Sequence, residues 1–264
     1  MPGLALLAGG IFLVFVALAA LAPLIARGDP NALNLADALL GPSAQHPLGT
    51  DQLGRDQLTR LLYGGRNTLA LAGSGTVGIL ALGLLVGVPA GYYGGRLDLA
   101  VSALTNTLLA LPSLLLTLAI LGVIGPGTGG MLLALIGGGW VGHARIFRAA
   151  VLALREQPYV EAARALGADG WRIVLRHLLP NLLPTVAVLG TLDFGALLLT
   201  VSSLSFLGLG VQPPTADWGV MLNEGRPFFG LAPLLAFAPG ACITVVALAS
   251  NLLGDTVRDL VDRR

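Results

Sequence analysis

Long apolar stretches separated by polar segments run through the whole chain. A helix that crosses a lipid bilayer needs about 20 consecutive, mostly apolar residues. Six stretches meet this requirement, at approximately residues 4–25, 69–93, 99–124, 131–151, 182–205 and 233–253. We therefore expect an all-α, polytopic membrane protein with about six transmembrane helices, organised as a single domain over residues 1–264.

The first stretch contains Ala20-Leu21-Ala22, which resembles the cleavage site of a signal peptide. Its apolar run is longer than that of an ordinary signal peptide, and no basic residue precedes it. We expect it to remain as an uncleaved membrane helix.

Two longer polar segments, residues 26–68 and 152–181, lie on opposite sides of the membrane if six helices cross it. Cytoplasmic loops of membrane proteins are enriched in arginine and lysine. A cytoplasmic N-terminus places Arg96, Arg145, Arg148, Arg155, Arg164, Arg172, Arg176, Arg258, Arg263 and Arg264 inside, and Arg27, Arg55, Arg60, Arg66 and Arg226 outside. Because this distribution follows the rule, we expect both termini in the cytoplasm, residues 26–68 outside and residues 152–181 inside.

The composition agrees with a membrane protein. Hydrophobic residues make up 55% of the chain and charged residues only 11%, whereas roughly a quarter of a soluble domain is charged. The mean hydropathy is +0.82. A soluble enzyme is therefore not expected, and a net charge of +1 gives no indication of nucleic-acid binding.

The chemistry that the chain can perform is limited. All basic residues are arginine, and without lysine a standard Walker A loop for ATP cannot form. Cys242 is the single cysteine, so the chain can form neither an internal disulfide nor a cysteine metal cluster. The His-Glu-x-x-His zinc motif is absent, and His46, a loop histidine beside proline, is interpreted as structural. We expect no catalytic residue, no metal site and no cofactor on this chain.

The inner segment predicts two short helices joined by a glycine corner. From Pro158 it reads PYVEAARALGADGWRIVLRHLLPN. Proline suits the first turn of a helix, and Gly167 can end that helix in a left-handed conformation. Asp169 can cap a second helix, which Pro180 would close. Because the first helix is rich in alanine and offers little apolar area to lipid, we expect it to fit a groove in another protein.

This segment resembles the EAA loop of ABC-transporter permeases, in which Glu-Ala-Ala is followed by three residues and glycine, and later by Leu-Pro. His177 stands where that family has isoleucine. The resemblance implies a cytoplasmic coupling helix that docks into a cleft of a separate ABC ATPase subunit. The coupling-loop residues that it indicates are Glu161, Ala162, Ala163, Gly167, Ala168, Asp169, Leu179 and Pro180.

Two further segments, both expected outside the membrane, narrow the resemblance to one group within the ABC-transporter permeases. Residues 46–56 read HPLGTDQLGRD, and residues 205–210 read SFLGLG, followed by VQPPTADWGVML. Both are similar to the dipeptide, oligopeptide and nickel permeases, in the C-type member of their permease pair. The similarity extends along essentially the whole chain.

The resemblance implies that this chain forms half of a translocation path for di- or oligopeptides in the cytoplasmic (inner) membrane of a bacterium or archaeon. Nickel or a metal chelate is the alternative cargo. The implied partners are a second homologous permease, cytoplasmic ABC ATPase subunits, an external or periplasmic solute-binding protein and membrane lipid. Asp217 and Trp218, in the second outer segment, are expected to contact the binding protein.

Two polar residues within the apolar stretches are candidates for the translocation path. Asp193 lies near the middle of the fifth stretch and Asn106 in the third. An intramembrane charge is costly and usually faces protein or water. Asp193 could meet a cationic or amine-bearing cargo, or it could pair within the chain with Arg145 or Thr200. His143 is expected at the cytoplasmic end of its helix.

A secondary transporter or channel that works alone is a remote alternative. It would need its own coupling-ion site, expected as paired intramembrane carboxylates or inverted repeats. Only Asp193 lies deep within a stretch, and the sequence shows no repeat.

A glycine ridge is predicted on the second stretch, where glycine recurs every four residues at Gly83, Gly87, Gly91 and Gly95. Small residues at this spacing let helix backbones approach closely. We expect this ridge to pack against another helix of the same chain, and a contact with a second subunit is the alternative.

Overall fold

The structure, a computed structural model, describes residues 2–26 and 28–262, and it contains helices but no strand among them. Arg27, Arg263 and Arg264 of the arginine distribution lie outside the described residues. The helices are α1 Pro2–Ala20, α2 Ala22–Ile25, η1 Leu35–Asp37, α3 Gln57–Tyr93, α4 Gly95–Leu109, α5 Ser113–Ile124, α6 Thr128–Leu154, α7 Pro158–Ala165, α8 Gly170–Ile173, η2 Val174–Leu178, α9 Leu179–Phe206, α10 Trp218–Gly225, η3 Arg226–Phe228 and α11 Leu234–Asp262.

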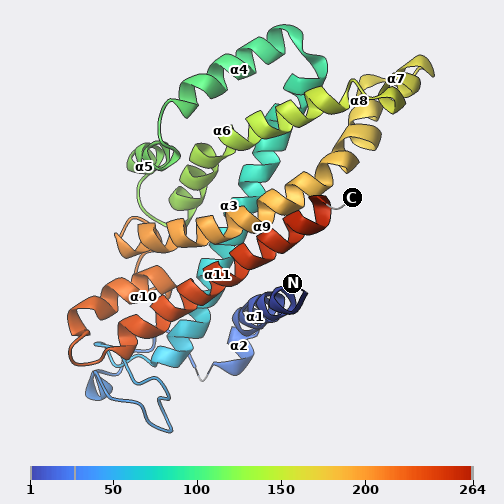
Figure 1. The fold of residues 1–264 in the computed structure, drawn as a ribbon. Helices are drawn as coiled ribbons and strands as arrows, with labels where there is room; N and C mark the ends of the chain where they lie inside the picture. The colour runs from blue at the N-terminus through green and yellow to red at the C-terminus, as the bar shows by residue number, and fades with distance from the viewer. Residues whose placement is uncertain (1, 27, 263–264) are drawn as a thin grey trace.

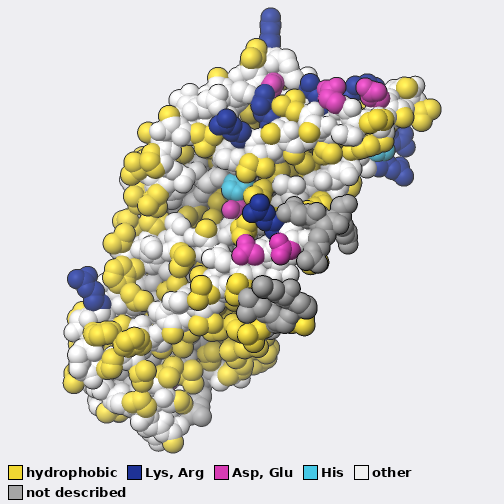
Figure 2. All heavy atoms as spheres, viewed as in Figure 1, with side chains coloured by type: hydrophobic (Ala, Val, Ile, Leu, Met, Phe, Trp, Pro, Cys, Tyr) yellow, Lys and Arg dark blue, Asp and Glu magenta, His cyan; other side chains and the backbone are white. Residues whose placement is uncertain are grey.

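Helix α3 is the longest element and forms the centre of the molecule. It packs mainly on α6 and α9, while α11 packs on α9 and α1 packs on α11. Figure 1 shows α6, α9 and α11 crossing α3, with α7 and α8 at one end of the molecule and α10 at the other. On the face viewed in Figure 2, most charged side chains gather at the α7–α8 end, and much of the remaining surface is apolar. This distribution is typical of helices that are embedded in lipid.

Four helices of the described chain are long and apolar enough to cross a membrane: α3, α6, the continuous Gly170–Phe206 and Leu234–Val261 of α11. Helices α4 and α5 meet the same criteria only together, as a pair bent by 91°. In α1, Leu6–Ala20 is apolar but shorter. The six predicted stretches therefore correspond to four long helices, one bent pair and one shorter helix.

The third predicted stretch is not one straight span. Pro112 adopts an extended conformation immediately before α5, with φ −56° and ψ 132°. Proline also disfavours a helical conformation in the residue that precedes it, here Leu111. The helix therefore breaks between Leu109 and Ser113, and the chain changes direction.

The second predicted stretch begins earlier than residue 69. Asp56 caps α3, because its Oδ2 accepts a hydrogen bond of 2.8 Å from the Thr59 amide, and the helix continues without interruption to Tyr93. Gly64 and Gly65 lie inside it. A Cβ atom at Gly65 would lie 2.7 Å from Cζ2 of Trp218, so glycine at this position allows α10 to approach.

The glycine ridge packs within the chain, as predicted. A Cβ atom at Gly83 would lie 2.7 Å from the His143 Cβ, and one at Gly87 would lie 2.3 Å from the Ala144 carbonyl oxygen. Gly91 faces Arg148 and Val151 in the same way. Gly95 is the exception, since it opens α4 and has no atom within 4 Å of such a Cβ.

The prediction that Pro180 closes a helix is wrong. Gly170–Phe206 is continuous, and its residues Val174–Leu178 form a π-helical segment directly before the proline. There the Leu179 amide bonds to the Val174 carbonyl, five residues back. Proline lacks the amide that a regular helix requires, and a single wider turn accommodates such a change within a helix. The inner segment thus leads directly into the fifth membrane helix.

Candidate functional site

The inner segment folds into the predicted helix, glycine corner and second helix. Helix α7 ends at Gly167, whose φ is +82°. The Gly167 amide bonds to the Arg164 carbonyl at 3.0 Å, and the Ala168 amide bonds to the Ala163 carbonyl at 3.1 Å. This pair of bonds defines a Schellman motif, in which glycine at the left-handed position avoids steric strain.

The second helix starts at a side-chain cap. Oδ1 of Asp169 accepts a hydrogen bond of 2.7 Å from the Arg172 amide, which satisfies one of the free amides at the start of α8. Gly167 and Asp169 together therefore determine the angle between α7 and α8. The sequence predicted both roles correctly.

One face of this corner is anchored and the other is free. Val160 and Ile173 are fully buried in a cluster that includes Phe147 of α6. By contrast, Leu166 is 88% exposed and Trp171 is 62% exposed. Of the predicted coupling-loop residues, Glu161, Ala162, Gly167, Asp169 and Pro180 are exposed, and Ala163, Ala168 and Leu179 are partly buried. The corner presents an apolar surface that no described part of the chain covers.

Asp193 pairs with His143 within the helix bundle. Oδ2 of Asp193 lies 2.6 Å from Nε2 of His143, and the two side chains are 23% and 15% exposed. The sequence had offered Arg145 or Thr200 as partners, but Arg145 is exposed, and the Thr200 hydroxyl donates to the Ala196 carbonyl. His143 also lies well inside α6, and not at its end. Sequence reasoning missed this pair because its members are 50 residues apart.

Asn106 is not part of this pair. It is exposed on α4, a helix that packs on α3 and α6, and among the described residues it makes no hydrogen bond to His143 or Asp193. Of the two residues predicted for the translocation path, the structure places only Asp193 at the contact between α6 and α9.

The expectation that Asp217 and Trp218 contact another protein is wrong for this structure, because their exposed fractions are 0% and 2%. Oδ1 of Asp217 caps α10 by accepting from the Gly219 amide at 2.9 Å. The Trp218 indole donates to the Leu61 carbonyl at 2.9 Å. Burial raises the pKa of the Asp217 carboxyl, although a hydrogen bond from Thr68 opposes this effect. Aspartate directly before a helix is a capping signal that could have indicated this role.

A network of four largely buried charged side chains joins the loop before α3 and the start of α3 to α10. Asp51 Oδ2 lies 2.6 Å from Arg55 Nε and 3.5 Å from Arg60 Nε. Glu224 of α10 bonds to both arginines, at 3.0 Å and 2.7 Å. The two arginines are only 2% and 1% exposed. Nothing in the sequence pattern indicated this network, since Glu224 lies 164 residues from Arg60.

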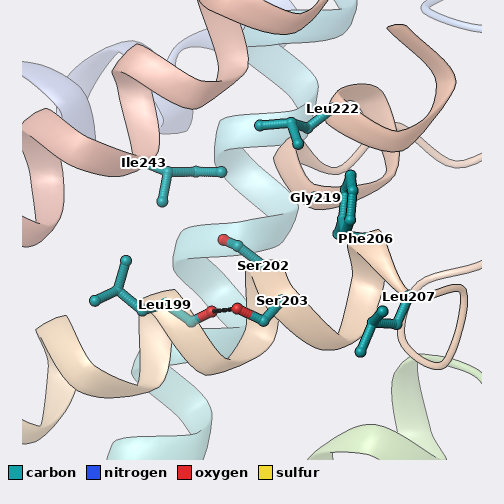
Figure 3. Close-up of a pocket in the computed structure, with 8 residues that line it drawn as sticks. All are labelled: Leu199, Ser202, Ser203, Phe206, Leu207, Gly219, Leu222 and Ile243. Carbon is teal, nitrogen blue, oxygen red and sulfur yellow. Dashed lines mark hydrogen bonds between the residues drawn. The ribbon is translucent and has the colours of Figure 1, made fainter. Parts of the chain in front are cut away.

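A cavity of about 350 Å³ lies between α9, α10 and α11 at the same end of the molecule. Figure 3 shows the Ser203 hydroxyl turned to the Leu199 carbonyl, to which it donates at 2.7 Å. The cavity is lined by Leu199, Ser202, Ser203, Phe206, Leu207, Gly219, Leu222 and Ile243. Because this lining is largely apolar and carries no charge, the cavity offers no charged partner to an ionic ligand.

A family profile described as "Binding-protein-dependent transport system inner membrane component" matches residues 83–264. The chain belongs to this family. The matched range includes the α7–α8 corner, His143, Asp193 and α10.

Two curated relatives resemble this inner membrane component over most of its length. The nickel transport system permease protein NikC of Escherichia coli K12 is 39% identical over 95% of this chain and 92% of its own. The dipeptide transport system permease protein DppC of Alkalihalophilus pseudofirmus is 39% identical over 94% of this chain and 82% of its own.

The fold of this inner membrane component resembles a solved structure, a chain of the MetNI methionine ABC transporter in an inward-facing conformation. The TM-score is 0.54 at 22% identity, and the match covers 77% of this chain and 97% of the other. The family is one of transport permeases and not of enzymes. A transport permease works through contact surfaces and through a path for its cargo. The α7–α8 corner is the candidate contact surface, and the His143–Asp193 pair is the candidate part of the path.

Proposed function

We propose that this chain is the permease subunit of an ABC importer and forms half of the translocation path beside a second homologous permease. The observation that carries the proposal is the free apolar surface of the α7–α8 corner. Leu166 and Trp171 are too exposed for a structural role within this chain, and exposed apolar surface marks protein contacts. A cytoplasmic ABC ATPase subunit would cover it.

The direction of the chain in the membrane follows from the same proposal. If the corner faces the ATPase, the opposite end, with the buried four-charge network and α10, faces outwards (Figure 1). The arginine distribution supports this orientation, with both termini in the cytoplasm. An external solute-binding protein would then deliver cargo at the α10 end, and ATP hydrolysis would take place on separate subunits.

We propose di- or oligopeptides as the cargo. Asp193 supports this choice, because its carboxylate can accept the amino terminus of a peptide. Nickel is the second candidate, since the chain is as similar to a nickel permease as to a dipeptide permease. His143 and Asp193 carry nitrogen and oxygen atoms that divalent metal ions also bind.

The variant Gly167→Asp tests the coupling surface. The backbone at position 167 has a left-handed φ, which strains any residue with a Cβ atom. The Schellman corner should therefore distort, and the ATPase should no longer copurify with the complex. Gly208→Asp is a matched control, because Gly208, in the connection between α9 and α10, has a similar φ of +77° and equally open space around its Cβ position. Normal ATPase association and full transport by the Gly167 variant would contradict the proposal.

Uptake by cells that lack this gene, with and without the gene restored, tests the cargo. Radiolabelled dipeptide and radiolabelled Ni²⁺ are supplied in parallel. Restored dipeptide uptake that excess unlabelled peptide abolishes would support the proposal. Restored Ni²⁺ uptake alone would replace peptide by nickel, and restoration of neither would indicate another solute.

A further inference from the structure

The His143–Asp193 pair has a defined number of protons. Nδ1 of His143 lies 3.0 Å from the Gly139 carbonyl oxygen, which can only accept a hydrogen bond, so Nδ1 carries a proton. Nε2 faces the Asp193 carboxylate at 2.6 Å. One further proton must therefore lie between Nε2 and Oδ2, and the pair as a whole is neutral.

It matters that the group paired with Asp193 is a histidine and not an arginine. An arginine at this position would remain charged at all times, whereas an imidazole can lose its proton and leave as a neutral group. An unpaired aspartate within the membrane would be costly. Histidine can thus neutralise the Asp193 carboxylate in the absence of cargo and still leave it free to bind a cation later.

The surroundings allow the pair to open. Both side chains are partly exposed, and Oδ1 of Asp193 accepts no hydrogen bond from any described residue. From α3, Gly83 faces the Cβ atom and backbone of His143, and this glycine has no side chain and no charge. The charged group that acts on the imidazole is Asp193 itself.

We infer that protonated His143 is the counter-ion of Asp193 in the absence of cargo. A cationic group of the cargo then replaces His143 as the partner of the carboxylate. The incoming ammonium or metal ion binds the Asp193 carboxylate, and the hydrogen bond from Nε2 breaks. The Nε2 proton passes to water in the path, which leaves a neutral imidazole. This inference rests on the proposed role of Asp193 in the path, and it applies to peptide and nickel cargo alike.

The resting state can be tested without cargo. The purified transporter complex, with ¹⁵N-labelled histidine in this subunit, is measured by solid-state NMR, and His143→Gln assigns the signal. Both ring nitrogens of His143 should be protonated. A neutral imidazole in the cargo-free complex would overturn the inference, whatever the cargo proves to be.

The exchange is tested by transport kinetics in proteoliposomes that contain the whole complex. His143→Arg introduces a cation that cannot leave, and it should raise KM by about tenfold or more. His143→Gln removes the cation but retains a hydrogen-bond donor, so KM should stay equal or fall. Thr200→Val on the same helix is a control, because its hydroxyl bonds only within α9. Both histidine variants are checked for intact assembly by cargo-free ATPase activity.

Dialanine and Ni²⁺ serve as separate probes, so that the two proposals can fail independently. Transport of Ni²⁺ but not dialanine by the unchanged complex would remove the peptide proposal, and the KM comparison would then use Ni²⁺. Equal changes in KM for the arginine and glutamine variants, with either transported probe, would indicate a merely structural pair and overturn the inference.

Discussion

The Thr68 hydroxyl donates a hydrogen bond of 2.6 Å to the buried carboxylate of Asp217, 149 residues further along the chain. The same hydroxyl oxygen accepts a hydrogen bond of 3.1 Å from the Trp218 amide. One side chain of α3 thus holds the start of α10 through both a charged and a neutral group. This contact connects the central helix α3 to α10, the helix that carries Glu224.

Thr68→Val should lower the thermal stability of the detergent-solubilised complex. The substitution leaves a buried carboxylate oxygen without its donor, which costs about 1–3 kcal/mol. Thr200→Val is the matched control, since the Thr200 hydroxyl bonds only to its own helix. The melting temperature of each variant provides the measurement. Equal melting temperatures for Thr68→Val and the unchanged protein would contradict a stabilising role.

Gly87→Ala should destabilise the contact between α3 and α6. The added Cβ atom would lie 2.3 Å from the Ala144 carbonyl oxygen, so the backbones must separate, at a cost of about 1–3 kcal/mol. Gly142→Ala on α6 is the control, because nothing lies within 4 Å of its Cβ position. Thermal unfolding should distinguish them, with a lower midpoint for Gly87→Ala only. A shared decrease would show that helix propensity or lipid contact matters more than the ridge.

Glu224→Gln should loosen the contact between α10 and the start of α3. It removes the carboxylate that binds Arg55 and Arg60, and breaking a buried ion pair costs about 3–5 kcal/mol. The cost should be lower here because the Glu224 side chain is 18% exposed. Limited trypsin digestion should detect new cleavage after Arg55, which is buried in the intact protein. As a control, Arg226→Gln changes an exposed arginine of η3 and should leave the digestion pattern unchanged. An unchanged pattern for Glu224→Gln as well would contradict a stabilising role of the charged network.

Leu166→Ser should weaken binding of the ATPase without changing the stability of this subunit. The side chain is 88% exposed at the α7–α8 corner, so its removal costs the isolated chain little, while a contact with the ATPase would lose apolar area. Leu231→Ser is a matched control in the connection between η3 and α11, where the side chain is 73% exposed. Copurification of the ATPase provides the readout. Loss of binding in both variants, or in neither, would argue against docking at this corner.

Local signals in the sequence predicted local structure well. The Schellman corner at Gly167 and the cap at Asp169 depend on bonds between residues no more than five positions apart. The glycine ridge was also readable, because its spacing alone indicates a helix face that approaches another helix. Local signals were less reliable where a neighbouring element changes the outcome. Pro180 would end an isolated helix, but the π-helical turn before it lets the helix continue.

Apolar length determined from the sequence alone that this chain is a helical membrane protein, because the cost of burying backbone polar groups in lipid leaves few other solutions. The short motifs in the inner segment likewise indicated the family. Only the tertiary structure decided that Asp217 and Trp218 are buried, that His143 is the partner of Asp193, and that Glu224 binds two arginines. These pairings join residues at least 50 positions apart, and no periodicity or local motif specifies which helices will bring such residues together.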